Sequence, residues 1–178
     1  KKINWEPPYI RAGRFGEWLR EIKDWAISRE RYWGTPLPVW ICEKCKKVEV
    51  IGSLEELKEK SGGSLPVNEK GELDLHRPYI DEINLTCTHS NCGGKLTRVK
   101  EVMDVWFDSG AMPFAQDHYP FENKKWVDGS GYPADFISEA IDQTRGWFYT
   151  LHGVGILTGR GKAYKNVICL GHLLDAKG

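Results

Sequence analysis

The sequence has no long hydrophobic run. No stretch approaches the roughly 20 apolar residues that a membrane-spanning helix requires. The N-terminus, Lys1-Lys2-Ile3-Asn4-Trp5, leads into proline and charge rather than into the apolar core of a signal peptide. Net charge is also absent, because 25 basic side chains balance 25 acidic ones. We therefore expect no membrane association, and the charge balance does not indicate a broad nucleic-acid surface.

Cysteine is scarce and its number is odd. Of the five cysteines, four form two close pairs, Cys42-x2-Cys45 and Cys87-x4-Cys92. Such pairs favour metal binding in a reducing compartment, here the cytoplasm, over a disulfide framework. Cys169 lies in an apolar run and is most simply a small buried hydrophobe.

The two cysteine pairs predict a zinc site. Two tight turns that each present two sulfurs toward one point suit a tetrahedral zinc ion, and glycines follow the second pair. The four-residue gap between Cys87 and Cys92 is at the edge of the usual range for zinc ligands, so His89 could replace one sulfur. The simplest alternative to a zinc site is reduced thiols without metal. The favoured ligands are Cys42, Cys45, Cys87 and Cys92, in a closed structural site that holds an insertion too small to bury its own core.

Tryptophan, by contrast, is abundant, with eight in 178 residues. Large aromatic side chains line apolar pockets as well as cores, so this number suggests a ligand cavity. The length allows one domain and a small inserted module.

Apolar spacing predicts both helices and strands. We expect helices over 14–28, after Ser53 (capped by Ser53 with Glu56), and over 144–157. We expect strands at 39–41, 48–51, 99–107 and 134–137 and within 165–174, with irregular chain at 65–86 and 116–132. Strand, helix and strand in residues 134–174 make a right-handed crossover between parallel strands.

Three segments carry a family resemblance. They are DWAISRERYWGTPLPVW at 24–40, MDVWFDSG at 103–110 and EAIDQTRGWFY at 139–149. Together they resemble isoleucyl-tRNA synthetases, in which a zinc knuckle pair also lies between the first two segments. The second and third segments favour the isoleucyl branch over the valyl and leucyl enzymes.

The resemblance implies an α/β fold, the second half of the Rossmann-type catalytic domain of a class I synthetase with an inserted small zinc ribbon. Residues 1–41 would be the catalytic segment after the editing domain, 42–98 the zinc-ribbon insertion, and 99–178 the Rossmann-type half ending just before the Lys-Met-Ser-Lys-Ser loop. The family's His-x-Gly-His signature, editing domain and anticodon-binding domain are not in this sequence, so we expect the chain alone to be inactive.

The implied function is isoleucine activation with ATP and magnesium to isoleucyl-adenylate, followed by transfer to tRNA(Ile) in protein synthesis. We expect a cytoplasmic monomer. Catalysis of this kind depends on positioning and electrostatics, so we expect no catalytic side chain in this segment. The family is itself the usual illustration that one methylene is discriminated only weakly, which is why editing belongs to the longer enzyme.

By resemblance, Trp106 and Trp147 are walls of the amino-acid pocket, with Gln143 near the polar groups of the substrate. Isoleucine offers only an aliphatic side chain, so its pocket must be apolar and shaped; packing in the core is the alternative for both tryptophans. ATP or adenylate binding is expected at a strand-to-helix junction and after the last strand. The residues expected there are Glu139, Ala140, Asp142, Gln143, Gly171, His172 and Leu173.

Several residues allow more than one role. Asp142 could also cap the following helix, and His172 is as readily a structural residue as a ligand contact. Asp104 and Asp108 are expected to be hydrogen-bonding supports of Trp106. We expect Arg29, Arg31 and Trp33 to pack at the hinge to the editing domain rather than to contact RNA.

Other functions are compatible with parts of the sequence. They are a valyl- or leucyl-type synthetase segment, a stand-alone zinc-ribbon module that binds nucleic acid, and a paralogue that binds tRNA without catalysis. The zero net charge and the lack of interleaved aromatic and basic residues argue against the zinc-ribbon module.

Overall fold

The computed structural model describes residues 3–178, which form two compact units. The first unit combines the segment that ends at Trp25 with Trp106–Gly178, and the second is Ala26–Val105. The second unit is therefore an insertion in the sequence of the first. It is wider than the ribbon predicted at 42–98 and includes residues on both sides of it.

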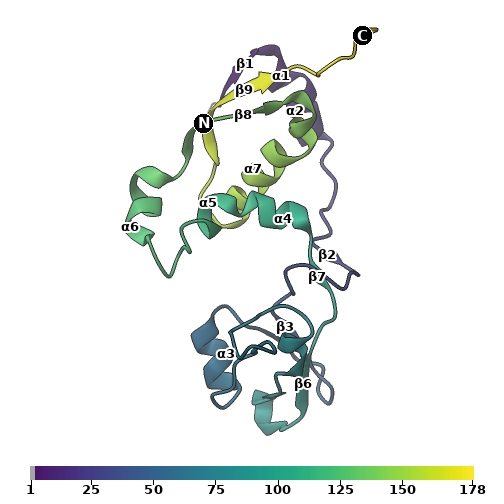
Figure 1. The fold of residues 1–178 in the computed structure, drawn as a ribbon, viewed down its shortest axis with the longest axis vertical. Coiled ribbons are helices and arrows are strands. Elements are labelled where there is room, and N and C mark those ends of the chain that lie inside the picture. Colours follow the sequence, from purple (N-terminus) through teal and green to yellow (C-terminus); the bar gives the residue numbers. More distant parts are fainter. Residues whose placement is uncertain (1–2) are drawn as a thin grey trace. The chain divides into compact units, whose positions relative to one another are not determined.

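A three-stranded parallel sheet organises the first unit (Figure 1). Its order is β1 (Asn4–Glu6), β9 (Tyr164–Leu170), β8 (Ala134–Ala140). Helix α7 (Trp147–Leu157) connects β8 to β9, so the predicted strand, helix and strand are confirmed, with a longer first strand. Strand β1, whose three residues pair with the middle strand, was not expected from the sequence.

Short helices and turns complete the first unit. They are α1 (Tyr9–Ala12), α2 (Arg14–Arg20), α4 (Val105–Gly110), α5 (Met112–Ala115), α6 (Lys124–Trp126), a π-helical turn at Val127–Gly131 and a 3-10 turn at Ile141–Arg145.

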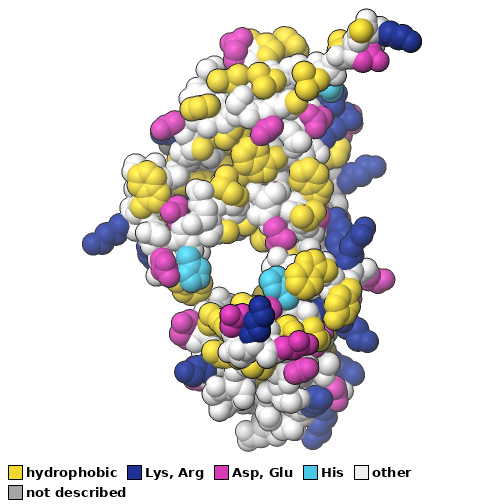
Figure 2. Space-filling view, in the orientation of Figure 1, with side chains coloured by type: hydrophobic (Ala, Val, Ile, Leu, Met, Phe, Trp, Pro, Cys, Tyr) yellow, Lys and Arg dark blue, Asp and Glu magenta, His cyan; other side chains and the backbone are white. Residues whose placement is uncertain are grey.

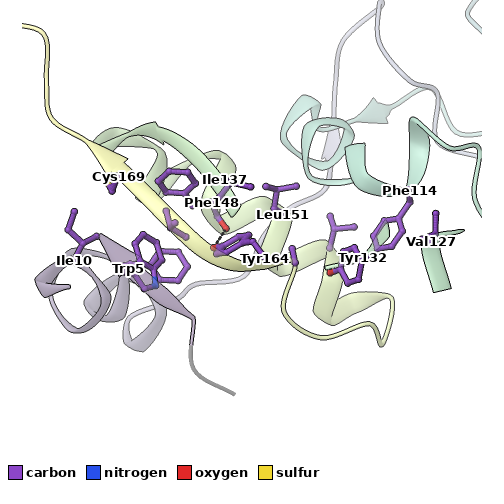
Figure 3. Packing of buried hydrophobic residues seen from close by; sticks show 14 residues of the cluster. Trp5, Ile10, Phe114, Val127, Tyr132, Ile137, Phe148, Leu151, Tyr164 and Cys169 are labelled. Atoms are coloured by element: carbon purple, nitrogen blue, oxygen red, sulfur yellow. Dashed lines mark hydrogen bonds between the residues drawn. The ribbon is translucent and has the colours of Figure 1, made fainter. Parts of the chain in front are cut away.

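An aromatic core packs against the sheet of the first unit (Figure 3). The ring of Trp5 on β1 lies 4.8 Å from that of Phe15 and 5.8 Å from that of Phe148, between centroids. The hydroxyl of Tyr164 donates a 2.7 Å hydrogen bond to the carbonyl oxygen of Phe148. Burial raises the pKa of Tyr164, so this hydroxyl stays protonated and links β9 to α7.

The second unit contains two small antiparallel sheets (Figure 1). The larger has the order β4 (Val48–Val50), β3 (Val39–Cys42), β6 (Lys95–Arg98), β5 (Leu85–Thr86). The smaller pairs β2 (Ser28–Arg29) with β7 (Val102–Met103). Helix α3 (Leu54–Lys60) and 3-10 turns at Tyr79–Glu82 and His89–Asn91 complete the unit.

The start of α3 confirms the predicted cap. The Oγ of Ser53 accepts a 3.1 Å hydrogen bond from the backbone N–H of Glu56. The Glu56 carboxylate in turn accepts from the N–H of Gly52 at 2.8 Å, one residue before the usual capping-box position. Both bonds satisfy backbone donors at the start of the helix that have no intrahelical partner.

A buried arginine joins the strands of the second unit to its 3-10 turn. The Arg98 side chain is 1% exposed, and its Nε donates to Asp81 Oδ1 at 2.6 Å. Its Nη1 donates to the carbonyl oxygens of Leu37 and Glu101 at 3.1 and 3.2 Å. Hydrogen bonds from Arg98 and Arg77 hold the pKa of Asp81 below its ordinary value, although burial acts in the opposite direction.

The predicted helix over 14–28 is too long, because α2 ends at Arg20. Trp25 nevertheless packs on the core of the first unit, with its ring centroid 5.9 Å from Tyr149 and 6.2 Å from Phe107. The apolar spacing therefore identified the burial of Trp25 but not its backbone conformation.

The predicted strand over 99–107 is mostly wrong. Only Val102–Met103 is a strand, and Val105–Gly110 is helix α4. A Cβ on Gly110 would lie 2.7 Å from the carbonyl oxygen of Thr150. Close packing of α4 against α7 thus overrides the strand preference of β-branched and aromatic residues. The predicted loop at 116–132 likewise contains α6 and the π-helical turn.

Acidic and basic side chains are interspersed on the visible surface of the second unit (Figure 2). No single-sign patch dominates that face, in agreement with the balanced composition. Among residues 3–178, no helix is long and apolar enough to cross a membrane.

Candidate functional site

The carboxyl ends of β8 and β9 meet at one edge of the parallel sheet. Ala140, the last residue of β8, pairs with Leu170, the last residue of β9. The chain continues from these ends into the turn Ile141–Arg145 and into 171–173. Parallel sheets of this kind bind ligands at this edge.

The edge brings together the residues expected to bind nucleotide. Glu139 and Ala140 end β8, Asp142 and Gln143 lie in the following turn, and Gly171, His172 and Leu173 follow β9. Most of these residues are exposed, while Ala140 and Gln143 are half-buried. The structure thus gathers two sequence-distant groups at one location.

A buried hydroxyl fixes the turn that carries Asp142 and Gln143. Thr144 is fully buried, and its Oγ1 donates to the carbonyl oxygen of Ile141 at 2.7 Å. The Oγ1 of Thr144 also accepts a 2.9 Å hydrogen bond from Nε of Arg14 in α2. Neither Arg14 nor Thr144 could be recognised from the sequence, because a contact across 130 residues leaves no local signal.

The helix cap considered for Asp142 is not present. The Oε1 of Gln143, rather than Asp142, accepts a 2.7 Å hydrogen bond from the backbone N–H of Trp147 at the start of α7. The Nε2 of Gln143 donates to Asp142 Oδ2 at 3.1 Å. A 3-10 turn separates Asp142 from α7, so its carboxylate does not reach the first helical N–H groups.

The two tryptophans expected to form the pocket lie at this same place. A Cβ on Gly146 would be 3.1 Å from Cη2 of Trp106, so the Trp106 ring lies directly over the residue before Trp147. The Nε1 of Trp147 donates a 3.1 Å hydrogen bond to the carbonyl oxygen of Ser109. Trp106 is 42% exposed and Trp147 is half-buried, so neither is fully enclosed in the core.

This arrangement places aromatic surface beside hydrogen-bonding groups. Indole faces suit an aliphatic ligand. The exposed carboxylates of Glu139 and Asp142 can accept hydrogen bonds from hydroxyl groups. The edge can therefore hold a molecule with an apolar end and a hydroxyl-bearing end.

A second candidate site lies in the inserted unit, where four cysteine sulfurs converge. The Sγ atoms of Cys42, Cys45, Cys87 and Cys92 all lie within 4.8 Å of one another. Two of the separations are 3.8 Å (Cys42 to Cys92) and 3.7 Å (Cys45 to Cys87). Zn–S bonds of about 2.3 Å in a tetrahedron require S–S edges of about 3.8 Å, so these thiols fit a zinc ion.

Tight backbone turns aim the sulfurs at one point. The N–H of Lys46 donates to the carbonyl oxygen of Cys42 at 3.0 Å, and the N–H of Gly93 to that of Cys87 at 3.1 Å. Gly93 has a φ of +62°. A Cβ on Gly94 would lie 2.8 Å from the Cys42 sulfur, so a side chain there would displace a ligand.

Among the described residues, His89 does not belong to the group of four, which agrees with the four-thiolate alternative. The N–H of Cys45 donates to Cys42 Sγ and, with other backbone contacts, lowers the pKa of that thiol to about 6. The N–H of His89 favours the Cys87 thiolate, but burial and the neighbouring sulfurs outweigh it and raise its pKa to about 12. A bound cation would offset the electrostatic repulsion between neighbouring thiolates.

Other residues that the sequence analysis considered have structural contacts. Buried Asp104 accepts a 2.6 Å hydrogen bond from Nη2 of Arg29. Trp33 is 66% exposed and stacks on His76 at 4.7 Å between ring centroids. Cys169 is buried, as expected.

Comparisons with known proteins cover the whole chain. The family model of class I tRNA synthetases (I, L, M and V) matches residues 1–178. Proteins named isoleucine–tRNA ligase are 54% identical in Thermus thermophilus, 56% in Clostridium novyi and 52% in Streptomyces coelicolor. These matches cover 99–100% of this chain but 16% of each relative, so the chain spans about one sixth of their length.

A solved structure also resembles the chain. The agnB2 LeuRS of Agrobacterium radiobacter K84, in a ternary complex with tRNA and LeuAMS, matches with a TM-score of 0.56 at 18% identity. The match covers 96% of this chain and 23% of that chain. At this identity the likeness establishes the fold alone.

Proposed function

The chain belongs to the class I tRNA synthetases of the isoleucine, leucine, methionine and valine group, and from this premise we propose that it is the amino-acid- and nucleotide-binding segment of an isoleucine–tRNA ligase. The main support is the 52–56% identity to ligases of that name over essentially the whole chain. The juxtaposition of Trp106, Gly146 and Trp147 beside the carboxyl edge of the sheet supports it independently.

In this proposal the isoleucine side chain lies against the indoles of Trp106 and Trp147. Apolar walls suit an amino acid with no polar group in its side chain. Gln143, whose Oε1 accepts the backbone N–H of Trp147, lies near the amino and carboxylate groups of the bound isoleucine. The alternatives in the same family, leucine, methionine and valine, differ in shape rather than polarity, so the spacing of the walls decides between them.

The nucleotide lies along the edge of the sheet. Asp142 and Glu139 accept hydrogen bonds from the ribose hydroxyls, and the backbone around Ala140 and after β9 (Gly171, His172 and Leu173) holds the rest of the adenosine. The exposed position of these residues at adjoining strand ends supports the assignment.

The reaction is adenylation followed by transfer to RNA. The isoleucine carboxylate oxygen forms a bond to the α-phosphorus of ATP, whose magnesium neutralises phosphate charge, and the bond to pyrophosphate breaks. A terminal ribose hydroxyl of tRNA(Ile) then forms the ester, loses its proton and releases AMP. The residues of this segment bind and orient; they supply no nucleophile.

The four cysteines hold a structural zinc ion in the inserted unit. The sulfur separations match a tetrahedral site, and the cluster has no open ligand position for a substrate. Zinc supplies folding energy to a unit with a small core. Charging of tRNA and thiolate ligation both suit the cytoplasm.

The direct test is ATP–pyrophosphate exchange by the full-length protein with isoleucine, leucine, methionine or valine. We expect isoleucine to have the highest kcat/KM. A higher kcat/KM for any of the other three would assign the protein to a different member of the family.

A further inference from the structure

Gly146 occupies the most crowded point of the candidate site. It joins the 3-10 turn to α7 and is buried. A Cβ at this position would lie 2.6 Å from Oε1 of Gln143, 3.1 Å from Cη2 of Trp106 and 3.2 Å from its Cζ3. Carbon atoms pack at about 3.5–4.0 Å, so any side chain would move at least one of these neighbours.

The Gln143 carboxamide cannot move without a cost. The Oε1 of Gln143 accepts the backbone N–H of Trp147 at 2.7 Å, and this donor belongs to the first turn of α7, which has no helical partner for it. The Nε2 of Gln143 donates to Asp142 at 3.1 Å. Displacing the carboxamide would disturb its hydrogen bond to Asp142, on the nucleotide side of the candidate site. It would also disturb the hydrogen bond from Trp147, on the amino-acid side.

The indole of Trp147 is held by α4, the helix that carries Trp106. The Nε1 of Trp147 donates to the carbonyl oxygen of Ser109 at 3.1 Å, and Ser109 Oγ donates to the carbonyl oxygen of Trp106 at 3.1 Å. Trp147 is therefore anchored on α4, while the Trp106 ring rests on the residue before Trp147. The two indoles are located relative to each other through Gly146 and Ser109.

We propose that Gly146 is a specificity-determining position of the amino-acid site. Its lack of a side chain lets the Trp106 ring approach α7, and this approach sets the distance between the two indole walls. The inference rests on the proposed function of Trp106 and Trp147 as pocket walls. Gly146 acts through its neighbours, so it is a positioning residue rather than a substrate contact.

The test compares two Gly→Ala variants of the full-length protein. In Gly146→Ala the new methyl meets both Gln143 Oε1 and the Trp106 ring at less than normal contact distance. In Gly153→Ala, within α7, it lies 3.7 Å from Cζ3 of Trp25, an ordinary contact. We expect Gly146→Ala to raise KM for isoleucine about 10- to 100-fold and KM for ATP by a clearly smaller factor, because only Gln143 links the crowded point to the nucleotide side. Both constants of Gly153→Ala should stay within about twofold of wild type. The kcat/KM ratio of isoleucine over valine should fall in Gly146→Ala alone.

A double-mutant cycle separates a specific contact from general damage. Trp106→Phe removes the ring atoms that a Cβ on Gly146 would meet. In that background the effect of Gly146→Ala on KM for isoleucine should shrink by at least about threefold. The double variant can be compared with Trp106→Phe even if Gly146→Ala alone does not fold.

Two results would overturn the inference and leave the proposed function intact. One is additive effects of Gly146→Ala and Trp106→Phe on KM for isoleucine, and the other is an equal loss of ATP and isoleucine affinity in Gly146→Ala. Wild-type protein without isoleucine-dependent exchange would instead overturn the proposed function, and this inference with it.

Discussion

The indole Nε1 of Trp147 donates a 3.1 Å hydrogen bond to the backbone carbonyl oxygen of Ser109, 38 residues earlier. An indole N–H can only donate, so a half-buried tryptophan is stable where an acceptor is fixed opposite it. The bond ties the first residue of α7 to α4 and sets the orientation of the ring at the candidate site.

Trp147→Phe tests this bond, because it keeps an aromatic wall but removes the donor. A neutral hydrogen bond contributes about 0.5–1.5 kcal/mol, so KM for isoleucine should rise about 2- to 13-fold. KM for ATP should change less. Exchange kinetics of the full-length protein measure both constants, and an unchanged KM for isoleucine would show that the bond does not position the wall.

The proposed zinc site at the four converging cysteines predicts about one zinc per chain. Cys87→Ser should lose the metal, because Cys87 supplies one of the four converging sulfurs. His89→Ala should retain it, since His89 is outside the group. Elemental analysis of the purified variants measures both results. Zinc loss in His89→Ala, with zinc retained in Cys87→Ser, would replace the four-thiolate site with one containing an imidazole.

Removal of zinc should destabilise the inserted unit. Its hydrophobic core is small, and metal binding contributes directly to the folding of such units. Amide exchange in β3 and β6 should accelerate after chelation and recover when zinc is restored. Unchanged exchange would mean that the thiols do not depend on a metal for their arrangement.

The pairing of Asp81 with buried Arg98 predicts a pH-dependent contribution to stability. The folded pKa of Asp81 lies below its ordinary value of 3.8. The contribution is therefore fully present above that value and is lost as pH falls through the folded pKa. Asp81→Asn should reduce protection of the β6 amides by about 1.5–3 kcal/mol near pH 6.

The difference in β6 amide protection between wild type and Asp81→Asn should become smaller as the pH falls below about 4. Asp135→Asn is the matched control, because its pair with Lys165 has an 83% exposed carboxylate and such pairs contribute little. A difference that stays constant down to about pH 3 would mean that ionisation of Asp81 is not what stabilises the unit.

Part of this structure could be predicted from local sequence. The Ser53 cap, the two cysteine pairs and the apolar run of β9 each depend on residues that are close together in the chain. They are found where expected because each is signalled by residues within a few positions of one another. The convergence of the two cysteine pairs and the pairing of β9 with β1 and β8 are long-range contacts.

Other parts depend on contacts between distant residues. The residues of 99–107 have strand-like composition, yet Gly110 allows α4 to pack against α7. The Arg14–Thr144 and Ser109–Trp147 bonds span 130 and 38 residues, and the cap of α7 comes from Gln143 rather than Asp142. No single-sequence pattern reports such pairings. The segment around Gly146 was recognisable as a motif, but the steric reason for its glycine was not.

We propose Trp147 as a wall of an isoleucine pocket, and the nearest alternative is that Trp147 only packs in the core. Two neighbouring variants distinguish the sites. Trp147→Ala removes the proposed apolar wall, whereas Asp142→Ala removes the proposed ribose contact, which ATP and the adenylate would share. Trp126→Ala, at a 54% exposed tryptophan of the same unit, controls for the loss of an indole elsewhere.

The most direct measurement is KM for isoleucine and for ATP in these variants of the full-length protein, with circular dichroism and zinc content matched to wild type. Loss of a large aromatic wall should weaken isoleucine binding by about 2–4 kcal/mol, or about 30- to 1,000-fold in KM, with a much smaller effect on ATP. Asp142→Ala should act mainly on ATP, and Trp126→Ala on neither. Equal weakening of isoleucine and ATP by Trp147→Ala, with the fold intact, would contradict the account and make Trp147 a core residue.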